Sequence, residues 1–472
     1  MRALALMQEP CQIYMLPIGG TATAALAGLL HDAGEQVCGV DAALYPPMSE
    51  LLFELGIPVR LGYDPALIPA AVREVVIGNA VPRSNPEVQA VLEKGLPYTS
   101  QAELFGRRFC HGVHSLVVAG THGKTTTTAL AAHVFTSAGL DPTVLVGGVP
   151  RGGRPWRLGR GGWTVVEGDE YNTAFFDKGP KFLHYSPHLF VVGNVEYDHA
   201  DLYPTLDAIV AAFRAGVALI RSDGHVVANA DDAGARTVAG TSRGVVWYGC
   251  GKGADLQCER WHVTGGLLNA ELRWAGERFA VAVPLVGRHN LDNLLAASTC
   301  ALLAGVPTGI IASATRSFAG VRRRLELLGE AGSIAVVDDF AHHPTAVALT
   351  LEGARQLFPG RRIVVAFEPR SLTAGRRTFA GMWENALSRA DAALVAPVFH
   401  RARLAPDQLL DREALAASLR RKGVHTSAPE EGQDLLGELR AMVREGDVVI
   451  CMSSGDFGGL ARRLLELLRE EA

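Results

Sequence analysis

The chain has 472 residues, which is too long for a single hydrophobic core and predicts about three domains. Hydrophobic residues make up 48% and charged residues 20% of the sequence, as in an ordinary soluble globular protein. The formal net charge of −4 leaves no basic surplus, which argues against a nucleic acid as the main partner. An anionic ligand therefore has to be held by local groups.

The sequence contains no pattern typical of a targeting signal or of paired cysteines. Gln8, Glu9 and Pro10 interrupt the apolar start before a signal-peptide core could form, and no stretch approaches the roughly 18 apolar residues of a membrane helix. The seven cysteines are scattered, odd in number and without a C-x-x-C pair, so we expect neither a disulfide framework nor a zinc site. These features favour a cytoplasmic protein without membrane association or an obligate protein partner.

The first region has the order of a nucleotide-binding βαβ unit. An apolar strand enters glycines over 13–20, a helix is expected over 22–33, and a second strand over 35–41 ends in Asp41. As a G-x-G-x-x-G fingerprint the turn is incomplete, because Pro17 and Ala22 stand where two glycines belong. A strand-to-helix turn without a ligand is therefore an equal alternative.

The second region opens with a strand over 115–120 and a glycine loop, followed by a Thr- and Ala-rich helix to about residue 139. Later elements are strands over 163–169 and 189–195, short β-like runs between about 225 and 285, and a helix over 289–305. Because the β-like runs alternate with Gly-rich turns, we expect an antiparallel insertion there.

The third region alternates strands with helices most regularly. Strands are expected over 333–339, 362–369, 392–399 and 447–454, with helices such as 345–357 and 412–422 between them. This order predicts a parallel, doubly wound sheet. Breaks near residues 113 and 320 divide the chain into domains 1–113, 114–320 and 321–472, all of the α/β class.

The glycine loop, residues 120–125, is the strongest single indication of chemistry. It departs from the standard phosphate loop G-x-x-x-x-G-K-[ST], because Val118 occupies the first glycine position. Between a strand and a helix the loop can still direct backbone N–H groups at a phosphate. Lys124 supplies a charge for the β- and γ-phosphates and Thr125 a hydroxyl for Mg²⁺. The alternative is an ordinary glycine turn with a surface lysine, but the flanking elements favour a nucleotide site.

Acidic side chains follow the next two strands of this region. The first cluster contains Glu167, Asp169 and Glu170, and the second contains Glu196, Asp198, His199 and Asp201. Both clusters lie at the carboxyl ends of strands, where open α/β sheets bind ligands. Phosphoryl transfer needs Mg²⁺ and groups that manage charge, and these clusters are candidates for both.

Five motifs, in this order, resemble the Mur ligases of peptidoglycan synthesis. They are GTHGKTTT (120–127), EGDE (167–170), NVEYDH (194–199), GRHNLDN (287–293) and DDFAHHPT (338–345). The similarity extends from the first glycines to SSGDFGG (453–459), nearly the whole chain. The resemblance implies three domains: a Rossmann-like domain for a UDP-sugar, a central ATPase-like domain with the phosphate loop, and a Rossmann-like C-terminal domain.

The resemblance also implies a reaction. ATP would convert the lactyl carboxylate of UDP-N-acetylmuramate to an acyl phosphate, which an amine would attack to give an amide, ADP and phosphate. YPPMS (45–49), DEYNTAFFDK (169–178) and FEPRS (367–371) are similar to the branch that adds L-alanyl-γ-D-glutamyl-meso-diaminopimelate in peptidoglycan recycling. The L-alanine-adding branch typically reads F-Q-P-H-R, so Arg370 and Ser371 favour the tripeptide. Alternatives are an L-alanine ligase and a nucleotide-dependent switch that performs no ligation.

Residue roles follow from the matching motifs. The implied catalytic residues are Lys124, Glu167 and His199; Thr125 and Glu167 would bind one Mg²⁺, with a second ion near His199. The implied nucleotide set is Gly120, Thr121, His122, Gly123, Lys124, Thr125, Thr126, His289, Asn290, Asn293, Arg324, Asp339 and Phe340. Gly19, Gly20, Thr21 and Asp41 would face the UDP group. His342, His343, Arg370, Ser371 and Gly455 would contact the peptide.

Several of these residues also have structural interpretations. His199 could be a histidine satisfied within the protein, Asn290 an N-cap and Asn293 a packing amide. Phe340 fits a core position and an adenine platform equally well, and we expect a packing role for His342 or His343. Pro17, Leu372, Ser454 and Asp456 depart from the family pattern, which affects the expected contacts to UDP and peptide.

Overall fold

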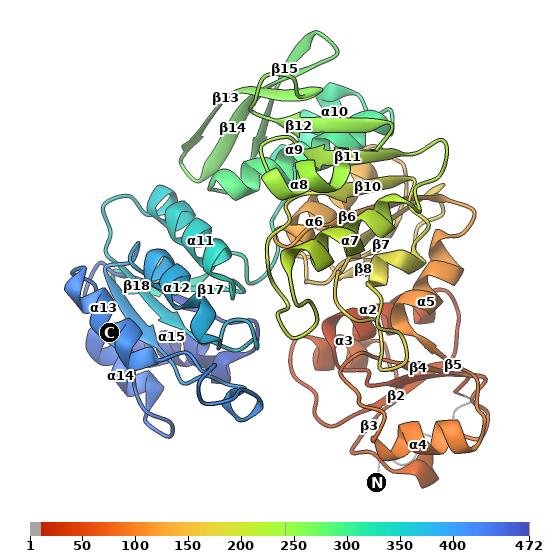
Figure 1. The fold of residues 1–472 in the computed structure, drawn as a ribbon, viewed down its shortest axis with the longest axis horizontal. Helices are drawn as coiled ribbons and strands as arrows, with labels where there is room; N and C mark the ends of the chain where they lie inside the picture. Colours follow the sequence, from red (N-terminus) through yellow and green to blue (C-terminus); the bar gives the residue numbers. More distant parts are fainter. Residues whose placement is uncertain (1–10, 241, 472) are drawn as a thin grey trace.

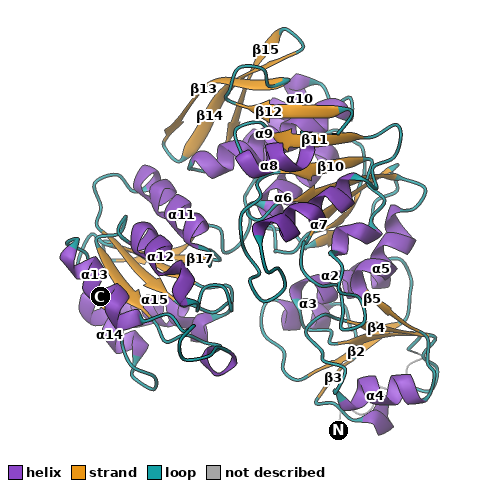
Figure 2. Cartoon of the chain, in the orientation of Figure 1, coloured by secondary structure: helices purple, strands orange, loops and turns teal. Residues whose placement is uncertain are grey.

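The computed structural model describes residues 11–240 and 242–471. They form three α/β parts, each built around its own sheet (Figures 1 and 2). The N-terminal part (red to orange in Figure 1) lies below the central part, and the C-terminal part (blue) lies beside them. The prediction of three α/β domains is confirmed. The apolar start with Gln8–Pro10 lies outside the described residues.

The N-terminal sheet has the order β3-β2-β1-β4-β5, and all its strands are parallel. The strands are β1 Ile13–Leu16, β2 Val37–Asp41, β3 Val59–Leu61, β4 Glu74–Ile77 and β5 Tyr98–Ser100. The helices are α2 Thr21–Asp32, α3 Met48–Glu54, α4 Pro86–Glu93 and α5 Gln101–Phe105, followed by a π-helical turn Gly106–Cys110. The predicted βαβ opening is therefore confirmed.

One disulfide contradicts the expectation from the cysteine pattern. Cys11 and Cys38 are bonded and buried, with Cα atoms 5.7 Å apart. Cys38 lies on β2, and parallel pairing of β1 with β2 brings the residues before β1 beside it. Spacing alone could not reveal this pair, because the contact depends on which strands are neighbours. The other five cysteines are free.

The central sheet has ten strands in the order β15-β14-β13-β12-β11-β10-β6-β9-β7-β8. They are β6 His114–Ala119, β7 Thr143–Leu145, β8 Trp156–Arg157, β9 Trp163–Gly168, β10 Leu189–Val192, β11 His225–Asn229, β12 Val245–Gly249, β13 Leu256–Thr264, β14 Leu267–Trp274 and β15 Glu277–Val283. The helices are α6 Lys124–Ser137, α7 Leu206–Val217, α8 Ala233–Ala239, α9 Arg288–Leu303 and α10 Thr308–Ser317.

The expected antiparallel insertion between 225 and 285 is only partly correct. β11 and β12 are parallel members of the main sheet, and β13 pairs with β12 in parallel. Only β13, β14 and β15 form an antiparallel meander. The short helix α8 connects β11 to β12, and its Ala- and Gly-containing sequence resembles a turn. The segment that contains α8 is therefore a crossover between parallel strands, where the sequence predicts a chain reversal.

The N-terminal and central parts share one apolar core, which extends from Ile13 to Ala239. Within it, α2 of the first part packs against β8 of the second. A Cβ atom at Gly28 would overlap the ring of Trp156, so this contact requires glycine. The Trp156 indole N–H also donates to Asp32 Oδ2 at 2.8 Å. Close packing fixes these two parts relative to each other.

The C-terminal sheet has the order β16-β17-β21-β18-β19-β20 and is parallel except for β16, which is antiparallel to β17. Its strands are β16 Glu326–Ala331, β17 Ile334–Asp339, β18 Ile363–Phe367, β19 Ala392–Val395, β20 His425–Ser427 and β21 Val448–Met452. The helices are α11 Pro344–Leu357, α12 Ala380–Leu387, α13 Arg412–Arg421, α14 Leu435–Met442 and α15 Leu460–Glu471. Separate apolar clusters cover its two faces, which confirms the predicted doubly wound arrangement.

Short 3-10 helices complete the described elements: Pro65–Leu67, Lys181–His184, Arg377–Phe379, Arg401–Arg403 and Phe457–Gly459. Within the described part of the chain, every helix is too short or too polar to span a membrane.

Candidate active site

A cavity of about 1640 Å³ is lined by residues from all three parts of the chain. The glycine loop, the carboxyl ends of the central strands and the start of α9 form one side, and residues from the N- and C-terminal parts complete it. Every residue that the sequence assigned to a site lines this cavity except Asp41, Gly120, His343 and Ser371. The fold therefore brings together groups that are far apart in the sequence.

The glycine loop joins the central strand β6 to helix α6. Val118 is buried within β6, where it pairs with Glu167 of β9 and Val191 of β10, so the loop begins only after Ala119. Gly120 and Gly123 have φ angles of 147° and 80°, which side chains adopt only with strain. Gly123 is the N-cap of α6, so the positive end of the helix dipole faces the cavity.

Asn194, a residue that the sequence did not assign to the site, fixes the shape of the loop. Its Oδ1 atom accepts the backbone N–H of His122 at 2.7 Å, and its Nδ2 atom donates to the His122 carbonyl at 3.1 Å. Its own carbonyl accepts the N–H of Thr121 at 2.9 Å. Asn194 belongs to the motif NVEYDH, but no local pattern identifies it as the residue that holds the loop.

Lys124 lies folded against its own loop and an acidic neighbour. Its Nζ atom donates to the Gly120 carbonyl and to Glu170 Oε2, each at 2.8 Å. Burial disfavours the charged form of Lys124. The negative charges of Glu170, Asp169 and Glu167 have the larger effect and raise the pKa of Lys124. Lys124 is therefore a charged group held at the phosphate loop.

Thr125 and Glu167, the predicted magnesium ligands, lie next to each other. The Thr125 hydroxyl donates to Glu167 Oε1 at 2.9 Å, and Glu167 Oε2 accepts the N–H of Gly147 at 2.8 Å. Burial and the charge of Asp169 raise the pKa of Glu167. A hydroxyl and a carboxylate beside a phosphate loop form a donor set that fits Mg²⁺.

Glu170 links Lys124 to His199, whereas the sequence assigned it no individual role beyond membership of an acidic cluster. It is 2% exposed, and its Oε1 atom lies 3.2 Å from His199 Nε2. Burial opposes protonation of His199, but the hydrogen bond that its ring donates to Glu170 prevails and raises the pKa of His199 to about 9. His199 is thus satisfied within the protein, and its place beside a second ion stays a prediction. Only its position in the acidic motif EGDE pointed to Glu170.

Helix α9 contributes a chain of side-chain amides that reaches helix α6. Asn293 Nδ2 donates to Asn290 Oδ1 at 3.0 Å, and the Thr127 hydroxyl donates to Asn293 Oδ1 at 3.0 Å. Asn290 in turn donates to the Val286 carbonyl at 2.8 Å. The N-cap of α9 is Gly287, so the alternative of Asn290 as an N-cap is wrong. The amides couple α9 to α6, and their contact with a nucleotide stays a prediction.

His289, the first of the three predicted α9 residues, differs from the two asparagines. Burial, with a smaller effect of the Arg324 charge, lowers the pKa of His289 to about 4. Its Nδ1 atom is buried without a hydrogen-bond partner. The imidazole is therefore neutral at neutral pH, and its Nδ1 atom makes no hydrogen bond within the described residues.

The C-terminal part reaches the loop through Arg324. Its Nη2 atom donates to the Thr125 hydroxyl at 3.3 Å, although 199 residues separate them. Phe340 is partly exposed at the cavity, with the guanidinium groups of Arg323 and Arg324 at 5.3 and 5.0 Å from its ring centre. This exposed ring favours a platform over a core role. Asp339 lines the cavity but uses its carboxylate to accept the N–H groups of Leu325 and Ala341.

Arg370 and Gly455, two of the predicted peptide-binding residues, are in direct contact. The Arg370 guanidinium stacks 3.7 Å from the centre of the Phe399 ring, and its Nη1 atom lies 3.4 Å from Glu368 Oε2. A Cβ atom at Gly455 would overlap Arg370, so the glycine makes room for it. Ser371 is turned to a local role, because its hydroxyl accepts the N–H of Ala374.

The two adjacent histidines have different surroundings. His342 lines the cavity, and burial lowers its pKa to about 4. His343 is 1% exposed, and its Nδ1 atom accepts the N–H of Thr345 at the start of α11. The expectation that one of the pair has a packing role is confirmed, and His343 is that residue. Its predicted peptide contact is not supported by its position, because its side chain caps a helix instead of lining the cavity.

The N-terminal residues lie at the start of α2. Gly19, Gly20 and Thr21 line the cavity beneath the positive end of this helix. Asp41 does not line it: Oδ2 accepts the Gly19 N–H and Oδ1 the Ala42 N–H, each at 2.7 Å. Asp41 therefore shapes the turn, and the prediction that it faces a ligand directly is not supported by its position.

Comparisons with known proteins agree with this arrangement. Family models match residues 12–111 (Mur ligase family, catalytic domain), 165–301 (Mur ligase middle domain) and 323–455 (Mur ligase, glutamate ligase domain). The UDP-N-acetylmuramate–L-alanyl-γ-D-glutamyl-meso-2,6-diaminoheptandioate ligase of Escherichia coli is 36% identical, covering 98% of this chain and 99% of the relative. The UDP-N-acetylmuramate–L-alanine ligase of Kineococcus radiotolerans is also 36% identical, with 97% and 96% covered.

A solved structure is similar over nearly the whole chain. The murein peptide ligase of Psychrobacter arcticus has a TM-score of 0.75 and 30% identity, covering 97% of this chain and 99% of the other. The three matched domain models, the full-length relatives and the shared cavity lead to one conclusion. This chain belongs to the Mur ligase family.

Proposed function

We propose that the chain joins the lactyl carboxylate of UDP-N-acetylmuramate to the amine of L-alanyl-γ-D-glutamyl-meso-diaminopimelate, using ATP and releasing ADP and phosphate. The observation that carries this proposal is the single cavity shared by Lys124, Arg370 and the Gly19–Thr21 turn. The full-length relatives are ligases with the same UDP-sugar in their names. The chain is an ATP-dependent ligase, as members of its family are.

The central residues are suited to activating a carboxylate. A free carboxylate is a poor acyl donor, and phosphorylation supplies it with a leaving group. Backbone N–H groups of the loop and the charge of Lys124 would hold the phosphates of ATP. Thr125 and Glu167 would hold Mg²⁺, which offsets negative charge on the phosphates. Two ions are proposed, the second near His199.

The C-terminal residues are suited to choosing the amine. Arg370 is pre-positioned by Phe399, Glu368 and the space at Gly455. A guanidinium binds carboxylates through two parallel hydrogen bonds, and the tripeptide carries several carboxylates. An L-alanine substrate offers only one. This difference favours the tripeptide over L-alanine as the amine substrate.

The remaining proposals concern the domain boundaries, the cellular compartment and the partners. The boundaries 1–113, 114–320 and 321–472 are supported by the three separate sheets. We place the reaction in the cytoplasm because ATP and UDP-sugars are made there. The scattered cysteines no longer support this location, because Cys11 and Cys38 form a disulfide. The partners are the two small-molecule substrates, with no nucleic acid, membrane or obligate protein partner proposed.

The test offers the purified protein UDP-N-acetylmuramate, ATP and Mg²⁺ with L-alanine, the tripeptide, or a tetra- or pentapeptide in separate reactions. Mass spectrometry should find the amide of the tripeptide as the main product. A main product with L-alanine would replace the proposal with its alternative. Phosphate release that proceeds equally without UDP-sugar and amine would instead support a nucleotide switch.

A further inference from the structure

A second group of polar side chains lies at the edge of the central sheet opposite the cavity. His114 begins β6, His188 directly precedes β10, and Asp223 lies two residues before β11. Because β6, β10 and β11 are parallel, these positions meet at the amino ends of the strands. The glycine loop is at the carboxyl end of β6, roughly 20 Å away for a six-residue strand.

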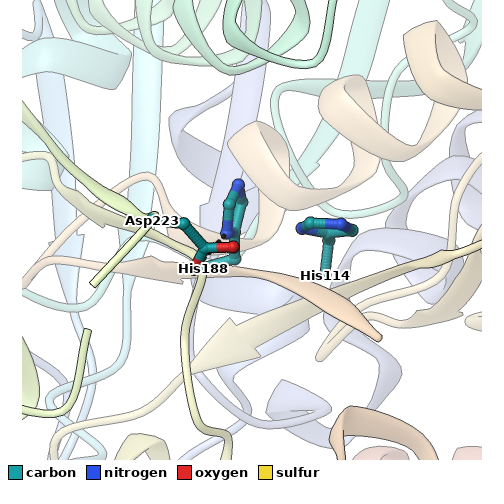
Figure 3. A group of neighbouring side chains, drawn as sticks. All are labelled: His114, His188 and Asp223. Atoms are coloured by element: carbon teal, nitrogen blue, oxygen red, sulfur yellow. Dashed lines mark ion pairs between the residues drawn. The ribbon is translucent and has the colours of Figure 1, made fainter. Parts of the chain in front are cut away.

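The three side chains converge on one small volume. Each offers one ligand atom, and these atoms all lie within 4.8 Å of one another. In Figure 3 the His188 ring lies between the Asp223 carboxylate and the His114 ring. The His114 and His188 ring centres are 4.3 Å apart, and His188 Nδ1 is 3.6 Å from Asp223 Oδ1. Two ligands of one tetrahedral Zn²⁺ at about 2.0–2.2 Å lie roughly 3.3–3.5 Å apart, so the three ligand atoms would have to move closer together around an ion.

Two imidazole nitrogens at this place make no hydrogen bond within the described residues, although one of them lies at ion-pair distance from a carboxylate. The Nδ1 atoms of His114 and His188 are buried and make no hydrogen bond within the described residues. Buried polar atoms normally make hydrogen bonds, so two nitrogens without one, in a group of three possible metal ligands, point to a ligand at this place.

The surroundings of the three side chains are closed on one side and open on the other. Trp163 closes one side, with its ring centre 5.1 Å from His114 and 5.7 Å from His188. On the other side Asp223 is half exposed, which leaves an entry path. Arg221 lies 3.3 Å from Asp223 Oδ1 and reduces the attraction for a cation, so we expect a site of moderate affinity.

We infer that His114, His188 and Asp223 form a binding site for a divalent transition-metal ion of the Zn²⁺ class, separate from the active site. Two imidazoles and a carboxylate suit Zn²⁺, Ni²⁺ or Co²⁺ better than Mg²⁺. Three protein ligands leave one coordination position for water. A bound ion would connect three strand starts and so stabilise the central sheet.

The test titrates Zn²⁺ into chelator-treated full-length protein by calorimetry, with Mg²⁺ in large excess. The wild type should bind Zn²⁺ with a rise in Tm, and Asp223→Ala and His188→Ala should each weaken that binding at least about 100-fold. Asp223→Ala is the safer variant because its side chain is half exposed. Equal Zn²⁺ affinity in the wild type and Asp223→Ala would overturn the inference.

Two controls separate this site from other metal-binding groups. His262→Ala removes an exposed histidine of β13 and should leave Zn²⁺ binding unchanged. Glu196→Gln breaks a second cluster, His122–Glu196–His343, beside the glycine loop. Binding that is lost in Glu196→Gln but kept in Asp223→Ala would overturn the inference. Arg221→Gln removes the competing charge and should tighten binding several-fold, on the order of threefold.

A spectroscopic measurement locates the ion. Ni²⁺ or Co²⁺ at this site should quench the fluorescence of Trp163, whose ring touches both histidines. In Trp163→Phe the metal should still bind, but most of the quenching should be gone. Quenching of the same size in Trp163→Phe would place the ion elsewhere and refute the assignment.

Discussion

The Nζ atom of Lys124 lies 2.8 Å from Glu170 Oε2, and the other oxygen of the same carboxylate lies 3.2 Å from His199 Nε2. One buried acid thus holds two cations from different elements, the start of α6 and the residues after β10. In this arrangement Lys124 is held in place before any phosphate arrives. The lysine that we propose to contact phosphate is therefore oriented by a buried glutamate of the neighbouring acidic cluster.

Replacing Lys124 by Ala should abolish ligation while the fold persists. Loss of one charged donor to a developing phosphate charge costs about 10²–10³-fold in rate. His199 still pairs with Glu170, so the remaining buried acid keeps a partner. Product formation would be followed by mass spectrometry and the fold by circular dichroism. Adding Glu170→Gln to this variant should not restore activity. Near-normal turnover of Lys124→Ala would contradict the phosphate role.

Arg370 provides the second prediction, through its neighbour Gly455. Gly455→Ala would place a Cβ atom inside Arg370 and force the guanidinium from its stacked position on Phe399. We expect the KM for the tripeptide to rise about tenfold or more, as in Arg370→Ala, because a charged hydrogen bond contributes about 1.5–3 kcal/mol. The KM for ATP should change little.

The matched control is Gly381→Ala in the same domain, where a Cβ atom meets nothing within 4 Å and φ is not positive. This variant should keep both KM values of the wild type. Equal increases in the KM values for ATP and tripeptide in Gly455→Ala would indicate a general distortion and argue against a peptide contact.

Sequence alone predicted the features that depend on neighbouring residues. The loop 120–125, the strand before it and the helix after it are local, and Thr125 and Glu167 both belong to recognisable patterns. The exceptions are contacts across long separations. The disulfide Cys11–Cys38 depends on strand order, and the pairing of Glu170 with two cations depends on how three segments meet.

The direction of a side chain is a second feature that the sequence did not predict. Asp41, His343 and Ser371 are in matching motifs, yet their polar atoms bond to nearby backbone N–H groups instead of facing the cavity. A motif fixes which residue stands at a position, whereas the local turn decides where its side chain points. The parallel pairing of β11 and β12 was missed because the short helix α8 resembles a turn.

Gly28 supports a prediction about stability alone. In Gly28→Ala the new Cβ atom would overlap the Trp156 ring, which lies between the N-terminal and central parts. Overpacking of a core costs about 1–3 kcal/mol, which exceeds the helical preference for Ala, so Tm should fall. Gly162→Ala, where a Cβ atom meets nothing, is the control and should leave Tm unchanged. An unchanged Tm in Gly28→Ala would contradict the prediction, because it would mean that Trp156 can move to accommodate the new Cβ atom without loss of stability.

His289 gives a prediction about pH. Its pKa is about 4 in the folded chain and about 6.5 when exposed, so the unfolded state binds more protons between these values. Stability should therefore fall as pH decreases from 7 to 5, with His289 responsible for about 1–2 kcal/mol of that loss. In His289→Asn the decrease in Tm between pH 7 and pH 5 should be smaller than in the wild type. His262→Ala, which removes an exposed histidine, should retain the wild-type pH dependence. Parallel Tm profiles for the wild type and His289→Asn would contradict a buried neutral imidazole at the start of α9.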